Sequence, residues 1–190
     1  MTAEELLERY AAGERDFSGT KLRYKAQLND ADLRDIRLDG ASLERIQLIG
    51  SNLAGASLKN VIMLGSRLER GIFCKANLSS ANLSNSNMES ANLQGAILQE
   101  AIMSQTWCKD ACFSYSDLRG ARMGQCYVKG CDFSYADLRD AFLEEDTFEA
   151  DLSYANFRGA QTRQNIEAIF GVGLLCNTTL PDGTVRNDDC

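Results

Sequence analysis

Every fifth residue of this chain is apolar from Leu28 to Phe148. The series comprises 25 positions, occupied by Leu, Met and Phe together with one Val and one Cys. A small residue, usually Ala or Ser, stands two positions before most of them, as Ala26 and Ala31 do. A period of five matches neither the period of about 3.6 residues of an α-helix nor the two-residue period of a β-strand. The chain is therefore built from an internal repeat, which limits the folds available to it.

A longer period lies on top of the first. The segments 113–121, 133–141 and 152–160 read FSYSDLRGA, FSYADLRDA and LSYANFRGA, so similar residues recur after 20 and then 19 positions. This recurrence predicts coils of four units, stacked so that equivalent residues lie above one another. Extended backbone rises about 3.3 Å per residue, so each coil would have a perimeter of about 66 Å and sides of about 16 Å. A lumen this narrow needs a small residue beside each large one.

The register of the repeat sets the expected domain boundaries. The repeat begins with Phe17 and Leu22, gains one residue before Leu28, loses one before Leu152 and closes at Phe157. We therefore expect an all-β solenoid over residues 15–160, with about seven coils that pair like parallel strands about 4.8 Å apart. The two ends of such a solenoid expose its core and need caps.

The segments at both ends are predicted to supply these caps. Thr2 and Glu5 have the spacing of a capping box at the start of a helix over residues 2–12. The apolar residues of this helix fall on one stripe: Leu6, Leu7, Tyr10 and Ala11. Residues 1–14 are thus the predicted N-terminal cap. Residues 161–190 are the predicted C-terminal cap, with a small helical segment followed by a turn-rich polar tail.

The composition argues against an enzyme. The chain contains no histidine, which removes the commonest general base and metal ligand and excludes Ser-His-Asp and Cys-His catalysis. Its seven cysteines include no C-x-x-C pair, so no zinc site is expected. Carboxylates are plentiful, but a rod filled with Leu offers no pocket for acid–base chemistry. We expect no cofactor and no metal.

Charge and hydropathy predict where the protein acts. The formal net charge is −7, so direct binding of nucleic acid is not expected. The sequence contains no run of 18 apolar residues, so no membrane span is expected. The acidic N-terminus lacks the apolar core of a signal peptide. A cytoplasmic location with reduced thiols follows. Cys108, Cys126 and Cys131 should point inward, and Cys74 and Cys112 should point outward. Cys176 and Cys190 in the tail could form a disulfide, and the sequence does not decide whether they do.

The repeat resembles the signature of pentapeptide-repeat proteins, Ala-(Asp/Asn)-Leu-x-x. The clearest copies begin at Ala31, Ala76, Ala81, Ala91 and Ala136. The resemblance covers residues 16–160 and implies a right-handed quadrilateral β-helix. The opening ELLERYAAGERDF is similar to that of cyanobacterial members. Most members have no known activity, and those understood mostly bind other proteins. Four units carry a larger or charged residue in the small position, with local widening expected at the first three: Ile36, Ile46, Val61 and Asp146.

Residues that recur every twenty positions predict the exposed columns of the rod. The columns proposed to bind a partner are Tyr115, Tyr135 and Tyr154, and beside them Arg119, Arg139 and Arg158. Tyrosine and arginine are enriched at the hot spots of protein interfaces. The simpler interpretation is that these side chains only stack and stabilise neighbouring coils, as cross-strand pairs do in sheets.

Two apolar columns are further candidates. Trp107 should lie above Tyr127 on one outward column, and Ile62, Ile102 and Phe142 should form another. Such patches can mark binding sites, or they can be ordinary surface residues or be covered in a dimer. We expect a monomer or a weak homodimer.

Three functional hypotheses follow. The first is a non-enzymatic rod that binds a protein partner through one face. The second is a DNA-mimicking inhibitor or protector of a type II topoisomerase such as DNA gyrase, as in the quinolone-resistance branch of the resembled family. It draws on the acidic run from Glu144 to Asp151, which can equally be a solvated face. The third is a structural or regulatory protein whose partner binds the caps.

Overall fold

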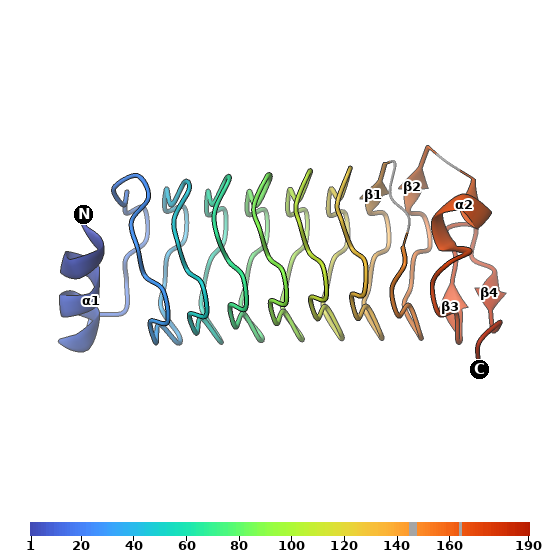
Figure 1. Ribbon diagram of the computed structural model, residues 1–190, viewed down its shortest axis with the longest axis horizontal. Helices are drawn as coiled ribbons and strands as arrows, with labels where there is room; N and C mark the ends of the chain where they lie inside the picture. The colour runs from blue at the N-terminus through green and yellow to red at the C-terminus, as the bar shows by residue number, and fades with distance from the viewer. Residues whose placement is uncertain (145–147, 164) are drawn as a thin grey trace.

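Each coil of the chain lies on the next and pairs with it through short parallel bridges. The computed structural model describes residues 1–144, 148–163 and 165–190. Over most of its length the pairing offset is 20 residues, as in Gln27 with Gln47. The offset is 21 for Asp16 with Arg37 and 19 for Asp132 with Asp151. These shifts confirm the inserted and the deleted residue of the repeat. The result is a straight rod with the two chain ends at opposite ends (Figure 1).

A tight turn closes most of the described five-residue units. In the unit that begins at Phe113, the amide of Ser116 donates to the Phe113 carbonyl at 3.1 Å. The third residue of that turn, Tyr115, has a φ of 59°. Positive φ at this position is usual for glycine, and it is costly for a bulky residue. The amide of Tyr115 also donates to Ser134 of the next coil at 2.9 Å, so inter-coil pairing holds the turn in place.

The lumen is filled as the five-residue period predicts. All 25 apolar positions from Leu28 to Phe148 are buried. Ile36, Ile46 and Val61, where the sequence predicted widening, are also fully buried, with exposed fractions of 0–1%. Their turn-closing hydrogen bonds measure 3.2–3.3 Å, so the coils remain closed around the larger side chains. The fourth exception, at position 146, lies outside the described residues.

Helix α1 (Ala3–Ala11) covers the first coil. Its capping box is formed: Glu5 donates its amide to Thr2 Oγ1 at 3.1 Å, and the Thr2 amide donates to Glu5 Oε2 at 2.8 Å. Only part of the predicted stripe is buried. Leu6 is fully buried, whereas Leu7 and Ala11 are exposed. The helix lies across the end of a narrow lumen, so it buries a shorter stretch than a helix packed along a flat surface would.

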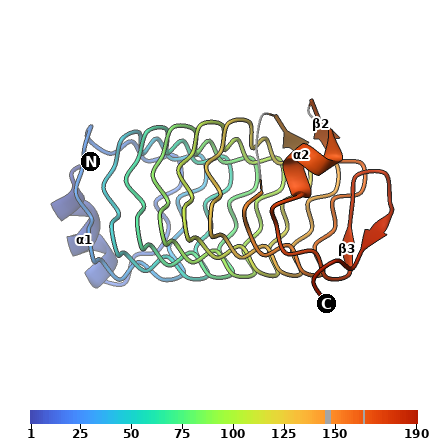
Figure 2. The same cartoon turned by 45° about the vertical axis from the view of Figure 1, so that its right-hand side comes forward.

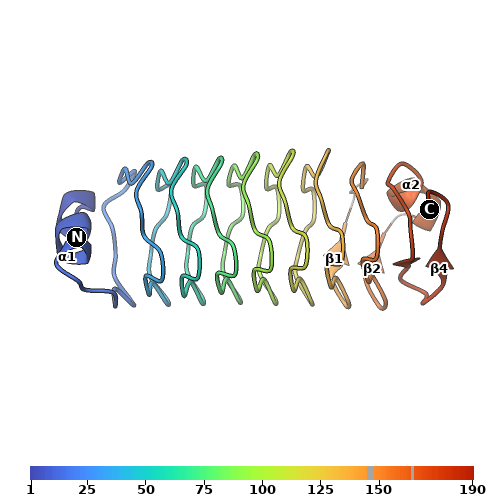
Figure 3. The same ribbon diagram turned by 90° about the horizontal axis from the view of Figure 1, so that it is seen from below.

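The coil continues beyond the repeat. Strand β1 (Phe142–Leu143) pairs in parallel with β2 (Gln161–Thr162), and helix α2 (Ile166–Phe170) follows. Strand β3 (Thr178–Thr179) lies on the last repeat unit, since the Phe157 amide donates to Thr179 at 2.8 Å. Residues of this added layer fill the lumen: Phe170, Leu175 and Leu180. Figures 2 and 3 show the layer closing the C-terminal end of the rod.

The tail folds back on this last layer. Strand β4 (Val185–Arg186) pairs antiparallel with β3, and Cys176 is disulfide-bonded to Cys190. Asp189 donates its amide to the Leu175 carbonyl at 3.1 Å, and its side chain accepts from the Leu175 amide at 2.9 Å. The sequence did not decide whether these two cysteines pair, and the structure shows that they do. Within the described ranges, no helix has the length and apolar character needed to cross a membrane.

Candidate functional site

The first candidate feature is a ladder of three stacked tyrosines, Tyr115, Tyr135 and Tyr154, here called the tyrosine ladder. Their ring centroids are 4.8 and 4.6 Å apart with interplanar angles of 1°. All three occupy the same turn position, with φ of 59–61°, which brings the rings into register. They remain 59%, 47% and 45% exposed. Loss of solvent contact raises the pKa of the Tyr135 hydroxyl, and its two neighbours add to the rise.

The neighbouring arginines are paired with acids. Arg119 donates through Nε and Nη2 to the Asp117 carboxylate at 2.9 and 2.8 Å. Arg139 contacts Asp137 in the same way, at 2.9 and 2.7 Å. The hydrogen bond from Arg119 is the largest cause of the lowered pKa of Asp117. Two of the three arginines in this column are therefore neutralised by an aspartate of their own coil.

The tyrosines and arginines flank one side of the rod. Tyr115 lies in the turn at one corner, Arg119 lies in the turn at the next corner, and Asp117 lies on the flat face between them. Arg158 differs from the other two arginines because Asn156 replaces the aspartate, accepting from the Arg158 amide at 3.0 Å. The structure thus brings the predicted columns onto one face, separated by Asp117, Asp137 and Asn156.

The second feature is the Trp107–Tyr127 pair on another side of the rod. The two rings stack with centroids 4.1 Å apart at an interplanar angle of 22°. Trp107 is 45% and Tyr127 38% exposed. Trp107 and Tyr127 are joined by a parallel bridge, which confirms that they lie in one column.

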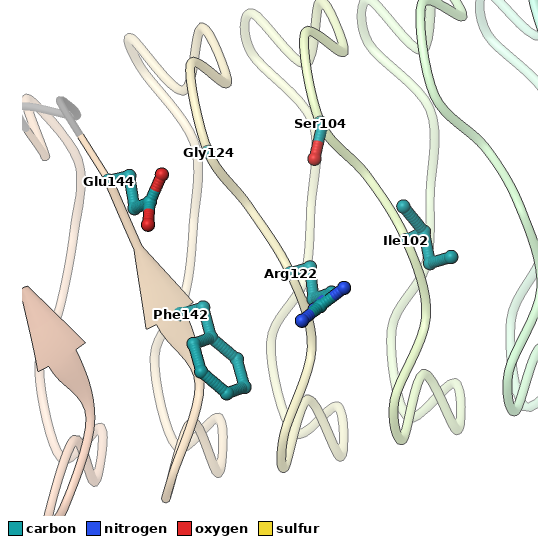
Figure 4. A pocket seen from close by; sticks show the side chains of 6 residues that line it. All are labelled: Ile102, Ser104, Arg122, Gly124, Phe142 and Glu144. Atoms are coloured by element: carbon teal, nitrogen blue, oxygen red, sulfur yellow. The ribbon is translucent and has the colours of Figure 1, made fainter.

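The third feature is a shallow depression of about 270 Å³ between neighbouring coils (Figure 4). Its lining comprises Ile102, Ser104, Arg122, Gly124, Phe142 and Glu144. The Arg122 guanidinium lies over the Phe142 ring, 5.2 Å from its centroid. Sequence analysis named Ile102 and Phe142 but missed Arg122 and Gly124. Gly124 could have indicated the depression. Its φ is not positive, so the backbone does not require glycine there, and the absence of a side chain leaves room for the depression.

The acidic run is partly neutralised by bases. Glu144 pairs with Arg163 at 3.0 Å, and Glu149 pairs with Lys129 at 3.0 Å. The run also includes residues 145 and 146, which lie outside the described residues. Among the described residues of the run, Glu144 and Glu149 are therefore neutralised by a base.

The residues that could bind a metal or react as a thiol are the acidic residues and the cysteines. No cluster of three or more His, Cys, Asp or Glu residues with metal-binding geometry occurs among the described residues. Burial raises the pKa of the Cys131 thiol to about 12, so this cysteine stays protonated at neutral pH. Its Sγ donates to the Cys108 carbonyl at 2.8 Å, which gives it a structural place in the lumen.

Comparison with known proteins identifies the family. The sequence profile described as "Pentapeptide repeats" matches residues 26–65, 73–105 and 111–145 in 8 copies, which is more than half of the chain. The chain therefore belongs to the pentapeptide repeat family, and its fold is the right-handed quadrilateral β-helix of that family. Members of the family are generally not enzymes. No curated protein matches this chain significantly.

Solved structures of similar proteins include two trypsin-treated variants of QnrB1, a plasmid-mediated fluoroquinolone resistance protein. They match with TM-scores of 0.56 and 0.57 at 22% identity, over 83% of this chain and 83–84% of theirs. At this identity the match shows a shared fold. HetL, involved in heterocyst differentiation regulation in the cyanobacterium Nostoc sp. strain PCC 7120, is 25% identical over 98% of this chain and 100% of its own, with a TM-score of 0.35.

Proposed function

We propose that this protein is a non-enzymatic binding rod that recognises a protein partner through the face of the tyrosine ladder. One observation carries the proposal: three of the six tyrosines are stacked in register on the outside, where the lumen requires no particular residue. A stack of three such rings exposes a large apolar surface beside a row of ion pairs. Aromatic residues next to arginine are the usual composition of interface hot spots.

The rigidity of the rod favours such a role. A tyrosine has two side-chain torsions, and neighbouring rings already restrict them here, so binding would cost little further side-chain entropy. The backbone on the flat faces is saturated, since Asp117 donates to Ala96 at 3.0 Å and Leu118 donates to Asp137 at 2.8 Å. A partner therefore cannot add a strand to these faces and must be recognised through side chains.

The available surface is sufficient for a specific complex. A standard interface buries about 800 Å² on each partner. The accessible surface of the chain is 8621 Å², so one face of the C-terminal half can supply this area.

The test is partner capture from the native cell extract, quantified by mass spectrometry. Changing Tyr135→Ala together with Arg139→Glu should lower recovery of the specific partner at least tenfold. The matched control is Tyr24→Ala, because Tyr24 is 60% exposed at the far end of the rod and outside the ladder. Unchanged recovery with the double variant would exclude this face as the binding site.

The alternative function is DNA mimicry directed at a type II topoisomerase. The net charge of −7 and the fold shared with QnrB1 support it. The pairing of Asp117 and Asp137 with arginines counts against it, because a mimic of the DNA backbone needs uncompensated negative charge. A gyrase supercoiling assay tests this function. If the protein neither inhibits nor protects gyrase at micromolar concentration, DNA mimicry is dismissed.

A further inference from the structure

We propose that the tyrosine ladder has a vacant rung at Gly95, which binds a planar aromatic side chain of the partner with an acidic residue of the same partner beside it. This inference rests on the protein-binding function proposed above and specifies the chemistry of the partner. Three observations support it: the backbone at Gly95, the uncovered ring of Tyr115, and the position of Lys75.

The backbone at Gly95 has the same conformation as the tyrosine rungs. Lys75, Gly95 and Tyr115 occupy the same turn position in successive coils, with φ of 57°, 64° and 59°. The inter-coil hydrogen bonds continue through this column, since the Gly95 amide donates to Ser114 at 2.9 Å. Gly95 is therefore a position of the ladder that lacks only the side chain.

The missing side chain leaves one ring face of Tyr115 uncovered. Tyr115 is 59% exposed, against 47% for Tyr135, which has a ring on both sides. Coils are spaced so that stacked rings lie 4.8 Å apart between Tyr115 and Tyr135. A ring inserted at the Gly95 level would have the same spacing from Tyr115, within the range that aromatic pairs favour.

Lys75 forms the opposite wall of the vacant rung. A Cβ added at Gly95 would have the Lys75 Cγ, at 3.7 Å, as its nearest neighbour. The aliphatic stem of Lys75 can thus cover the second face of an inserted ring while its ammonium reaches solvent. None of the ion pairs among the described residues includes Lys75. Its charge favours a carboxylate next to the inserted ring and disfavours an inserted arginine.

The Trp107–Tyr127 pair lacks such a position. The coil before Trp107 presents Asn87 at the bridged place, so a side chain already occupies that level. Of these two aromatic stacks, only the tyrosine ladder has a glycine, Gly95, at the equivalent position of the coil before its first ring. The occupant is a segment in which Phe, Tyr or Trp stands within two residues of Asp or Glu.

The experiment uses a phage-displayed peptide library selected on the immobilised full chain. We expect enrichment of peptides with an aromatic residue close to an acidic one, and synthetic copies are then measured by fluorescence anisotropy. Gly95→Tyr fills the rung with a residue that the same turn accepts at Tyr115, and it should weaken binding at least tenfold. Lys75→Glu should also weaken binding.

The matched control is Gly40→Tyr. Gly40 has a φ of 65° and open space around its Cβ position, so the variant meets the same backbone cost far from the ladder. It should bind the peptides as the parent does, and circular dichroism should show both glycine variants folded. The proposal of a vacant rung is overturned if the selected peptides lack an aromatic residue or if the selection yields no peptide. It is also overturned if the peptides bind Gly95→Tyr as tightly as they bind the parent protein.

These outcomes are separable from failure of the proposed function. If native partner capture depends on Tyr135 and Arg139 but is unchanged in Gly95→Tyr, the face binds a protein and the rung is not used. If the double variant at Tyr135 and Arg139 captures the partner normally, the binding face itself is rejected.

Discussion

Truncating Phe133 tests whether the aromatic stack in the lumen stabilises the rod more than the equivalent stack outside. Phe133 is fully buried and stacks on Phe113 with centroids 4.8 Å apart and an interplanar angle of 3°. It also meets Phe148 edge-on at 5.5 Å. Two residues further along, Tyr135 stacks between two rings at similar spacing but is 47% exposed. The two positions therefore share a geometry and differ in burial.

We expect Phe133→Ala to destabilise the rod more than Tyr135→Ala does. Removal of a buried Phe ring costs about 3–5 kcal/mol, because the lost transfer energy is joined by the cost of the cavity. The closely packed coils above and below Phe133 cannot collapse into that space without breaking inter-coil hydrogen bonds, which places Phe133→Ala at the upper part of this range. Tyr135→Ala removes two exposed stacked pairs at about 0.5–1.5 kcal/mol each, so about 1–3 kcal/mol.

The assay is urea denaturation followed by circular dichroism, with hydrogen exchange to locate the loss. Repeat proteins can unfold in parts, so exchange in the coil that contains position 133 reports the local effect directly. A loss at Phe133→Ala no larger than that at Tyr135→Ala would refute the argument, because burial in the lumen would then contribute nothing beyond stacking.

Three further predictions concern charge, the C-terminal end and the depression. Asp117, whose folded pKa is lowered by Arg119, stabilises the fold fully above its unfolded pKa of about 3.9 and loses this contribution as pH falls through the lower folded value. Asp117→Asn should therefore flatten the loss of thermal stability on acidification, and an unchanged profile would contradict this. Cys190→Ser should lower the stability of the C-terminal layer by about 3 kcal/mol by opening a disulfide loop, with faster hydrogen exchange over residues 174–190 as the readout. Gly124→Ala should raise the melting temperature slightly, equivalent to about 0.4–1 kcal/mol, because a Cβ there meets its nearest atom at 3.6 Å; a lower melting temperature would show hidden strain.

The exposed side chains were harder to predict than the buried ones. The sequence placed Tyr115, Tyr135 and Tyr154 in one outward column, and the structure stacks them. It also placed Arg119 and Arg139 beside them, but it did not predict that each is paired with an aspartate. Recurrence at twenty residues reports which residues share a column, but it does not report which rotamer a long side chain adopts. Rotamers depend on neighbours in the same coil as well as on those above and below.

The irregular ends show the same limit. Thr2 and Glu5 predicted the start of α1 because a capping box is a local motif. The burial of Leu6 but not of Leu7 depends on how the helix crosses the lumen, which no local pattern contains. After residue 160 the period is lost, so neither the added layer nor the Cys176–Cys190 disulfide could be read from spacing.

By itself the sequence determined the four-sided coil, its register shifts and the residues of its lumen. It could do so because a residue facing a narrow closed interior must be apolar at every turn of the repeat, and so leaves a periodic trace. The tertiary structure alone decided the ion pairs, the uncovered ring of Tyr115 beside Gly95, and the strand pairing and disulfide of the C-terminal layer. These features arise from contacts between coils and chain ends at irregular separations, and solvent-facing positions accept many residues, so no period records them.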